Sequence, residues 1–481
     1  MSMLNLPLAL STLTLAATQP LAAVADLPAS SANEVREVLD ALGPNVVNQP
    51  IIQTVLLSLF VIYLASKTGG EITNRLGLTS ILGELLGGAI VGISFLGLVV
   101  LPGEGITAGN SLLLQFIQFF HADLTPAAVE AVFEAQGKIL SNLSQLGVIL
   151  LLFQVGLESN LRELVRVAPQ AAVVVLVGIS APLFVGLAGL IFLFNQDVQG
   201  ALFAAAAPTA VSIGISASIL TDLGMLKSPE GQLIVGAAVL DDITGILILT
   251  VIIGISSGSG IGVLSLLGLV LSAAAFLVGS TALSRLIGSL FVDLLKPMRV
   301  RGGLLMLSLA FCFGLGFIAD TLRLEALMGA FAAGLILSQT EVRNNLEHQL
   351  EPVAQLLVPI FFVVTGARTD LRVINPFAPG GWSVLMMGLF LAAMVAIGRI
   401  GGARMLPAKQ NINRLAVGVG MLPLGEVALV IAGVGVSSGQ MSSQLSAAVV
   451  LAILVTVSLT PICLRAALSQ ETSGDAVGRK T

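Results

Sequence analysis

Charged side chains are scarce in this 481-residue chain. Asp, Glu, Lys and Arg together make up 10% of the residues, against about 25% in an average soluble domain, whereas hydrophobic residues make up 56%. This balance excludes an ordinary soluble protein and indicates an integral membrane protein that crosses the lipid bilayer many times. The formal net charge of −5 also excludes a general nucleic-acid binder.

Residues that commonly bind metals or form disulfide bonds are also few. The two cysteines, Cys312 and Cys463, both lie in apolar runs, so we expect packing residues and neither a disulfide framework nor a zinc site. The two histidines, His121 and His348, are too few for a histidine metal site or a proton wire. We therefore expect no cofactor.

Residues 1–49 are predicted to form a leader segment followed by an external tail. Residues 3–25 are apolar and end in small residues, as a signal peptide does, but they lack the basic residues with which such a signal begins. A cleaved signal, an additional helix and a disordered leader all stay open.

From residue 50 onward, apolar runs of the length that a bilayer requires follow one another. They predict an all-α polytopic protein with thirteen transmembrane helices, at 50–66, 78–101, 141–157, 169–194, 199–221, 231–256, 260–284, 302–319, 324–338, 350–367, 381–403, 414–436 and 441–465. The segment 102–140 is predicted to be the one long loop. Its cluster of Phe116, Phe119 and Phe120 indicates a position on the membrane surface.

Basic residues are distributed unequally between the two sides of these spans. Five lie on the side of the amino terminus and sixteen on the opposite side, while Arg399 lies inside a span. Because cytoplasmic loops are enriched in Lys and Arg, we predict an external or lumenal amino terminus. The carboxyl-terminal tail, 469–481, is then cytoplasmic.

Two motifs recur seven spans apart. Gly156-Leu-Glu-Ser-Asn-Leu-Arg162 is similar to Gly366-Ala-Arg-Thr-Asp-Leu-Arg372, and Glu84-Leu-Leu-Gly-Gly-Ala89 is similar to Glu325-Ala-Leu-Met-Gly-Ala330. An odd offset reverses the direction through the membrane, so the pattern predicts two inverted-topology repeats of six spans each, linked by the seventh span. Such repeats are typical of secondary transporters.

Prolines interrupt two spans at corresponding places in these repeats, at Pro208 in the fifth and Pro423 in the twelfth. Proline removes a backbone donor and frees a carbonyl group. Freed carbonyls and half-helix ends can bind ions at membrane depth, so we expect two broken, crossing helices at the site. Two ordinary proline kinks are the alternative.

Two adjacent carboxylates, Asp241 and Asp242, lie in the middle of the sixth span. A charge at that depth costs at least a few kcal/mol and is usually kept to bind a cation or a proton, although burial against an arginine for packing alone is the alternative. Arg399 is the only basic residue at this depth and must find an acid, for which we select Asp241. Glu426 in the twelfth span is either a ligand or a residue that ties down the broken helix.

Hydroxyl groups near Pro208 complete the predicted site. Thr209 and Ser212 are three residues apart, so we expect them to share a helix face and to offer two oxygens. Hard monovalent cations prefer carboxylate, hydroxyl and carbonyl oxygens, as other hard cations do. The predicted Na⁺ or K⁺ ligands are Asp242, Asp241 and Thr209, with Ser212 beside them.

With these motifs the chain resembles the cation:proton antiporter-2 family, the bacterial Na⁺/H⁺ and K⁺/H⁺ exchangers. The resemblance runs from about residue 50 and rests on Leu82-Gly-Glu-Leu-Leu-Gly-Gly88, Gly236-Ala-Ala-Val-Leu-Asp-Asp242, Pro359-Ile-Phe-Phe-Val-Val-Thr-Gly366 and Pro423-Leu-Gly-Glu-Val-Ala-Leu429. The aspartate pair is its most specific part. The long loop after the second span looks like that of cyanobacterial members.

The resemblance implies a homodimer whose core domain slides past a dimer domain in an elevator form of alternating access. The dimer domain would comprise 50–167 and 300–372, the core domain 168–257 and 373–468, and the linker helix would lie in 258–299. Asp242 would bind either a cation or a proton, and Asp241 would pair with the basic residue of the eleventh span.

Two positions depart from the family pattern. The family often has lysine at the position of Arg399, and an arginine effectively cannot release its proton as a lysine can. Where the family often has Thr-Ser-Val-Ala, this chain has Thr209-Ala-Val-Ser212. The first departure leaves the proton stoichiometry open, and the second leaves the choice between Na⁺ and K⁺ open.

The resulting hypothesis is a secondary antiporter, not an enzyme, that exchanges Na⁺, K⁺ or Li⁺ for H⁺ in a bacterial plasma membrane, or in a thylakoid membrane if the source is a cyanobacterium. A K⁺ efflux system gated by a separate subunit is an alternative, since we expect no attached nucleotide-binding domain. An organic-anion transporter would show more basic residues at depth. An aspartyl protease is disfavoured because adjacent helical residues point about 100° apart.

Overall fold

A computed structural model describes residues 43–76, 79–102, 106–121, 124–256, 302–322, 324–368, 381–407 and 412–478, with single positions between 268 and 293. In these residues the regular secondary structure is helical, and one isolated bridge joins Val211 to Leu424. Residues 1–42 of the predicted leader and tail, most of the seventh span and the repeat-motif residues 369–372 lie outside the described residues, whereas residues 43–49 of the predicted tail are helical.

The chain divides into two compact units, and the first comprises residues 1–58 and 101–139. It holds the beginning of α3 (Gly43–Arg75), η2 (Ala108–Asn110), α5 (Leu112–Phe120) and the beginning of α6 (Pro126–Glu158). The prediction of one long loop over 102–140 is therefore wrong. Thr125 caps α6 by accepting the N–H of Ala128 at 3.3 Å, and Pro126 follows it, which together begin a helix well before the apolar run.

Helix α5 in this unit is amphipathic. One face is buried and consists of Leu113, Leu114 and Ile117. The other face carries the exposed rings of Phe116, Phe119 and Phe120. An exposed aromatic face suits a helix at the membrane surface, and that position stays a prediction.

The second unit comprises residues 59–100 and 140–481 and contains the remaining helices. These are α4 (Ser80–Val91), α7 (Leu161–Ser180), η3 (Ala181–Gly186), α8 (Leu187–Phe192), α9 (Val198–Ala206), η4 (Ala207–Thr209), α10 (Ile213–Asp222), α11 (Pro229–Ser256), α14 (Gly303–Thr321), α15 (Ala326–Leu337), α16 (Arg343–Ala367), α17 (Gly381–Arg404), α18 (Arg414–Gly420), α19 (Glu426–Ser437) and α20 (Ser443–Gly478). Most predicted spans in the described residues overlap a helix or helices in series, but the span predicted at 78–101 is helical only over Ser80–Val91. Eight helices there are long and apolar enough to cross a membrane, and four shorter apolar helices accompany them.

Glycines bring several of these helices into backbone contact. A Cβ atom on Gly366 of α16 would overlap the carbonyl oxygen of Leu85 on α4. A Cβ atom on Gly156 of α6 would in the same way overlap the carbonyl oxygen of Phe331 on α15. Close approach through small residues is how helices associate in lipid, where burial of apolar surface gives little driving force.

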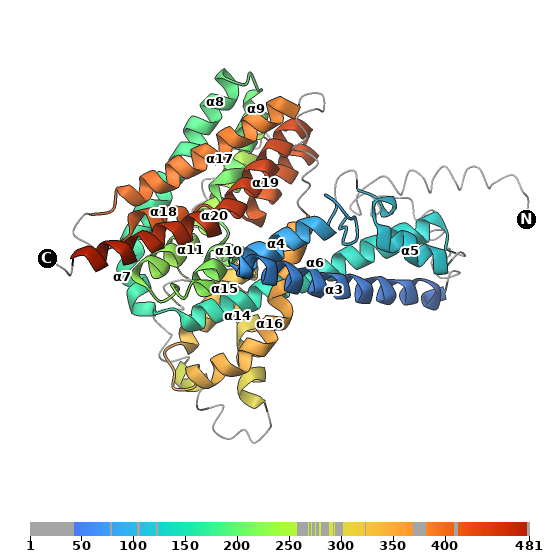
Figure 1. Ribbon diagram of the computed structural model, residues 1–481, viewed down its shortest axis with the longest axis horizontal. Coiled ribbons are helices and arrows are strands. Elements are labelled where there is room, and N and C mark those ends of the chain that lie inside the picture. The colour runs from blue at the N-terminus through green and yellow to red at the C-terminus, as the bar shows by residue number, and fades with distance from the viewer. Residues whose placement is uncertain are drawn as a thin grey trace, which may run out of the picture. The chain divides into compact units, whose positions relative to one another are not determined.

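Helix α17 carries Arg399, which is fully buried. It packs along α7 and η3 on one side and along α20 on another, and α17 (orange) and α20 (red) run side by side in Figure 1. The η3 segment is one turn of π-helix that contains Pro182, and such turns interrupt α-helices frequently at functional sites. Gly178 and Gly398 let α7 and α17 approach closely at this level.

Both helix breaks predicted from proline are present. In the first, η4 ends at Thr209 and α10 begins at Ile213, with extended residues between them. In the second, α18 ends at Gly420 and α19 begins at Glu426. Pro208 lies within η4, and Pro423 lies in the second break. The two interrupted helices therefore expose backbone groups at their centres, and these groups need partners.

Candidate ion-binding site

The two breaks meet and satisfy part of each other's backbone. The N–H of Ser212 donates to the carbonyl of Pro423 at 2.8 Å, next to the bridge between Val211 and Leu424. The hydroxyl of Ser216 donates to the carbonyl of Gly420 at 2.8 Å, which caps the end of α18. Direct hydrogen bonds between the two breaks thus hold the crossover together.

Asp241 is locked into this crossover. Its side chain is fully buried, and Oδ2 accepts the N–H of Val211 at 2.7 Å. Arg399 forms a two-pronged ion pair with it, Nη1 to Oδ1 at 2.7 Å and Nη2 to Oδ2 at 3.0 Å. The Nη2 group also donates to the carbonyl of Thr209, at the end of η4. The ion pair expected between Asp241 and Arg399 is therefore formed, and it binds the backbone of the first break at Thr209 and Val211.

Arg399 is closely surrounded as well as paired. Its side chain is the largest by volume among the fully buried side chains of the described residues. A Cβ on Gly178 would lie 2.8 Å from the Cδ atom of Arg399. Its Nε atom has no hydrogen-bond partner among those residues. A planar fork with two terminal nitrogens suits the two carboxylate oxygens better than the single ammonium of lysine would.

Asp242 faces a different environment from its neighbour. It is 3% exposed and lines a small cavity of about 10 Å³ together with Ser212, Gly425 and Glu325. That volume is about the smallest that can hold one water molecule. Because successive helical residues point about 100° apart, Asp241 turns to the arginine while Asp242 turns to this inner cavity.

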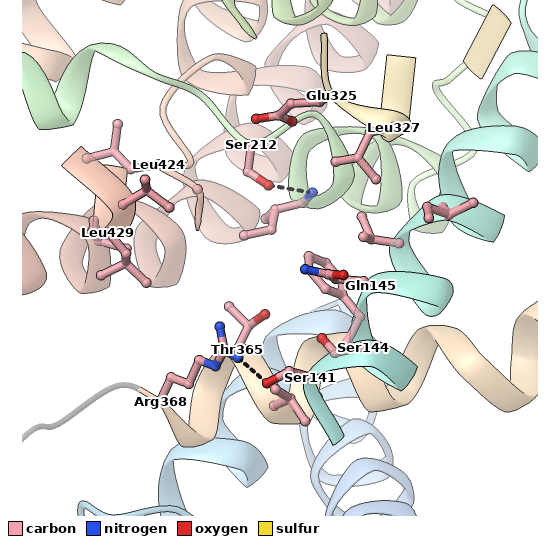
Figure 2. Close-up of a pocket in the computed structure, with 18 of the residues that line it drawn as sticks. Ser141, Ser144, Gln145, Ser212, Glu325, Leu327, Thr365, Arg368, Leu424 and Leu429 are labelled. Carbon is pink, nitrogen blue, oxygen red and sulfur yellow. Dashed lines mark hydrogen bonds between the residues drawn. The ribbon is translucent and has the colours of Figure 1, made fainter. Parts of the chain in front are cut away.

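A larger cavity adjoins the inner one. It has a volume of about 390 Å³, and we call it the vestibule. Ser212, Glu325, Leu327 and Gly425 line both cavities. Figure 2 shows Glu325 and Ser212 at one end of the vestibule and Arg368, hydrogen-bonded to Ser141 at 2.6 Å, at the other.

The predicted hydroxyl pair is arranged differently from the expectation. Thr209 and Ser212 do not share a helix face, because the extended residues of the break separate them. The hydroxyl of Thr209 donates to the carbonyl of Ala206 at 2.7 Å and lines neither cavity. Ser212 lines both cavities, and its hydroxyl accepts the N–H of Ile215 at 3.4 Å as the cap of α10. The side chain of Glu426 lies outside the described residues.

Glu325 is the residue at this site that sequence reasoning missed. It belongs to the repeat motif that begins at this position, yet nothing in the motif marks it as a neighbour of the aspartate pair. It immediately precedes α15 and has an extended backbone, so the loop rather than a helix places it. Its closeness to Asp242 comes from the packing of distant segments.

A buried aspartate pair beside crossing helix breaks is a specific arrangement, and a family profile agrees with it. The profile described as "Sodium/hydrogen exchanger, transmembrane" matches residues 56–470. The chain belongs to the sodium/hydrogen exchanger family. This membership confirms the predicted family and its interpretation as an integral membrane transporter rather than an enzyme.

Two curated relatives in this family are similar over most of their length. The high-affinity Na⁺/H⁺ antiporter NhaS3 of Synechocystis is 46% identical over 416 residues, covering 86% of this chain and 90% of the relative. The Na⁺/H⁺-K⁺ antiporter GerN of Bacillus cereus is 30% identical over 409 residues, covering 84% and 94%. The first of these relatives agrees with the predicted similarity to cyanobacterial members.

A solved structure has the same fold. The sodium proton antiporter MjNhaP1 of Methanocaldococcus jannaschii superposes with a TM-score of 0.57, covering 88% of this chain and 99% of that chain. The sequences are 15% identical in this alignment, so the likeness concerns the fold alone.

Proposed function

We propose that this protein is a secondary antiporter that exchanges Na⁺, and with it K⁺ or Li⁺, for H⁺, and that the cation and the proton compete for Asp242. The proposal rests on the different surroundings of the two neighbouring aspartates. One carboxylate is held by a buried arginine, whereas the other lines a cavity of about 10 Å³ next to the vestibule.

The surroundings of Asp241 argue against a role as the exchanging group. Both of its oxygens accept hydrogen bonds, from Arg399 and from the N–H of Val211. Because the guanidinium stays charged at every physiological pH, it favours the ionised form of the carboxylate beside it. Asp242 is thus left as the group that gains and loses a proton, and Ser212 can supply a hydroxyl oxygen to the same cavity.

Alternating access supplies the coupling in this proposal. When the site faces one side, either a cation or a proton occupies Asp242, and the occupied site then moves to the other side. Competition at one carboxylate couples the two fluxes without direct contact between the substrates. Low pH favours the protonated site and therefore lowers the apparent affinity for the cation.

We further propose the architecture that the family resemblance implies. Thirteen spans would form two inverted repeats, divided between a dimer domain and a mobile core domain, with the amino terminus outside and two protomers in a dimer. The close approaches at Gly366 and Gly156 support the repeat, because they join α16 to α4 and α6 to α15, which are exchanged by the predicted symmetry. The crossing helix breaks at Pro208 and Pro423 also support the repeat, because they lie in the fifth and twelfth spans, which correspond in the predicted symmetry.

The test uses the purified protein in liposomes with an imposed pH gradient and a pH-sensitive dye. Addition of Na⁺, K⁺ or Li⁺ should dissipate the gradient with the wild type and not with Asp242→Asn. Asp241→Asn serves as the matched comparison, since it is expected to lower thermal stability as well as transport. If the folded wild type responds to none of the three cations, or if Asp242→Asn exchanges normally, the proposal is wrong.

A further inference from the structure

Glu325 occupies the junction between the vestibule and the inner cavity. It lines both, together with Ser212, Leu327 and Gly425, and it is the one side chain among these four that carries a carboxylate. Its side chain is half-buried, whereas Asp242 deeper inside is 3% exposed. A cation that moves from the vestibule toward Asp242 therefore passes this carboxylate first.

The two cavities differ in how much water they can hold. The vestibule, at about 390 Å³, has room for a hydrated ion, whereas the inner cavity has about 10 Å³. A cation must therefore lose most of its bound water at the junction. Carboxylate oxygens are the strongest replacement ligands for a hard cation, and a negative charge at the mouth of a low-dielectric cavity raises the local cation concentration.

In the described part of the chain, the vestibule wall has two other charged groups, and neither of them lines the inner cavity. Asp320 and Arg368 line the vestibule but not the inner cavity, and both are exposed. The guanidinium of Arg368 donates to Ser141 on α6, at the end of the vestibule opposite Glu325 in Figure 2. The remaining polar lining near Ser141 is neutral, with Ser144 and Gln145.

We propose that Glu325 is the access carboxylate of the exchanger, a specificity-determining residue that replaces part of the hydration shell of the cation before it reaches Asp242. The cation is a dehydrating monovalent ion such as Na⁺. This inference rests on the proposed function, in which Asp242 is the exchanging group. Glu325 acts on the capture of the cation and on the choice between cations, and leaves the exchange step itself to Asp242.

The experiment measures the Na⁺ dependence of exchange in proteoliposomes for wild type, Glu325→Gln and Glu325→Asp. We expect Glu325→Gln to raise the KM for Na⁺ by about fivefold to tenfold, which is about 1.0–1.4 kcal/mol, with kcat within about twofold of wild type. Glu325→Asp should restore most of the affinity, since it keeps the charge. The ratio of the KM values for Na⁺ and K⁺ should change in Glu325→Gln.

Asp320→Asn is the matched control, because it removes a carboxylate from the vestibule without touching the inner cavity. It should change KM by less than about twofold. An unchanged KM in Glu325→Gln would overturn the inference, and so would an equal rise in Asp320→Asn, which would indicate a general surface potential. If Glu325→Gln fails to fold, Glu325→Ala takes its place: a raised KM for Na⁺ with kcat preserved supports the inference, and an unchanged KM or a loss of kcat alone overturns it.

Failure of this inference differs from failure of the proposed function. Loss of exchange in Asp242→Asn together with a normal KM in Glu325→Gln refutes the role of Glu325 alone. Normal exchange in Asp242→Asn refutes both.

Discussion

Replacing Arg399 with methionine should destabilise the crossover more than any exposed substitution on the same helix. The change leaves the carboxylate of Asp241 fully buried with the N–H of Val211 as its one remaining described donor. Breaking a buried ion pair by removing one partner costs about 3–5 kcal/mol, because a buried charge is left without compensation.

The double variant Arg399→Met with Asp241→Asn should recover part of this loss. An asparagine oxygen can still accept the N–H of Val211, and no buried charge remains. The carbonyl of Thr209 stays without the donor that Arg399 provides, which costs about 1–3 kcal/mol in both variants. We therefore expect the double variant to lie between Arg399→Met and wild type, with a coupling of about 2 kcal/mol between the two positions.

Thermal unfolding of the detergent-purified protein, followed by the loss of monodisperse material, gives the ranking. Arg404→Met is the control, since Arg404 is the exposed basic residue at the end of α17 and should change the Tm little. Additive effects of Arg399→Met and Asp241→Asn in the double variant would refute the reasoning. A wild-type Tm for Arg399→Met would do the same.

Two further predictions concern helix packing and the proton count. Gly366→Val should abolish stable folding, because its Cβ would overlap the carbonyl of Leu85. Gly314→Ala is the control and should keep the wild-type Tm, since nothing lies within 4 Å of the added atom. Equal Tm values for both variants would contradict the packing. Arg399→Lys should make exchange depend on membrane voltage if the wild type does not, because lysine can release a proton, and valinomycin-clamped liposomes measure this directly. An unchanged voltage response would show that neither arginine nor lysine at this position exchanges a proton during transport.

Much of the fold can be predicted from the sequence because lipid imposes simple requirements. Apolar length fixes where helices can lie. Pro208 and Pro423 indicate the breaks because they recur at corresponding places in the two predicted repeats, whereas Pro169 and Pro461 lie inside helices that continue. The partner of Arg399 can be inferred by elimination, since a buried guanidinium needs an acid and few acids lie at that depth. Each of these inferences uses a feature that is visible in a short stretch of sequence and that costs free energy unless the fold accommodates it.

The parts that could not be predicted depend on where a helix begins or on which distant segments meet. The start of α6 at Pro126 lies in a polar stretch, so hydropathy alone assigns it to a loop. Thr209 and Ser212 share a helix face only if the helix continues past Pro208, and the break between η4 and α10 prevents this. Glu325 lines the same inner cavity as Asp242 because tertiary packing brings distant segments together, and no spacing along the chain encodes that arrangement.

The central claim, that a cation and a proton compete for Asp242, is tested most directly by the pH dependence of the apparent KM for Na⁺ in proteoliposomes. Competition predicts that KM rises toward about tenfold for each unit by which the pH falls once the site is mostly protonated, with the maximal rate at saturating Na⁺ preserved. A KM that stays constant across the pH range while the maximal rate alone changes would contradict it.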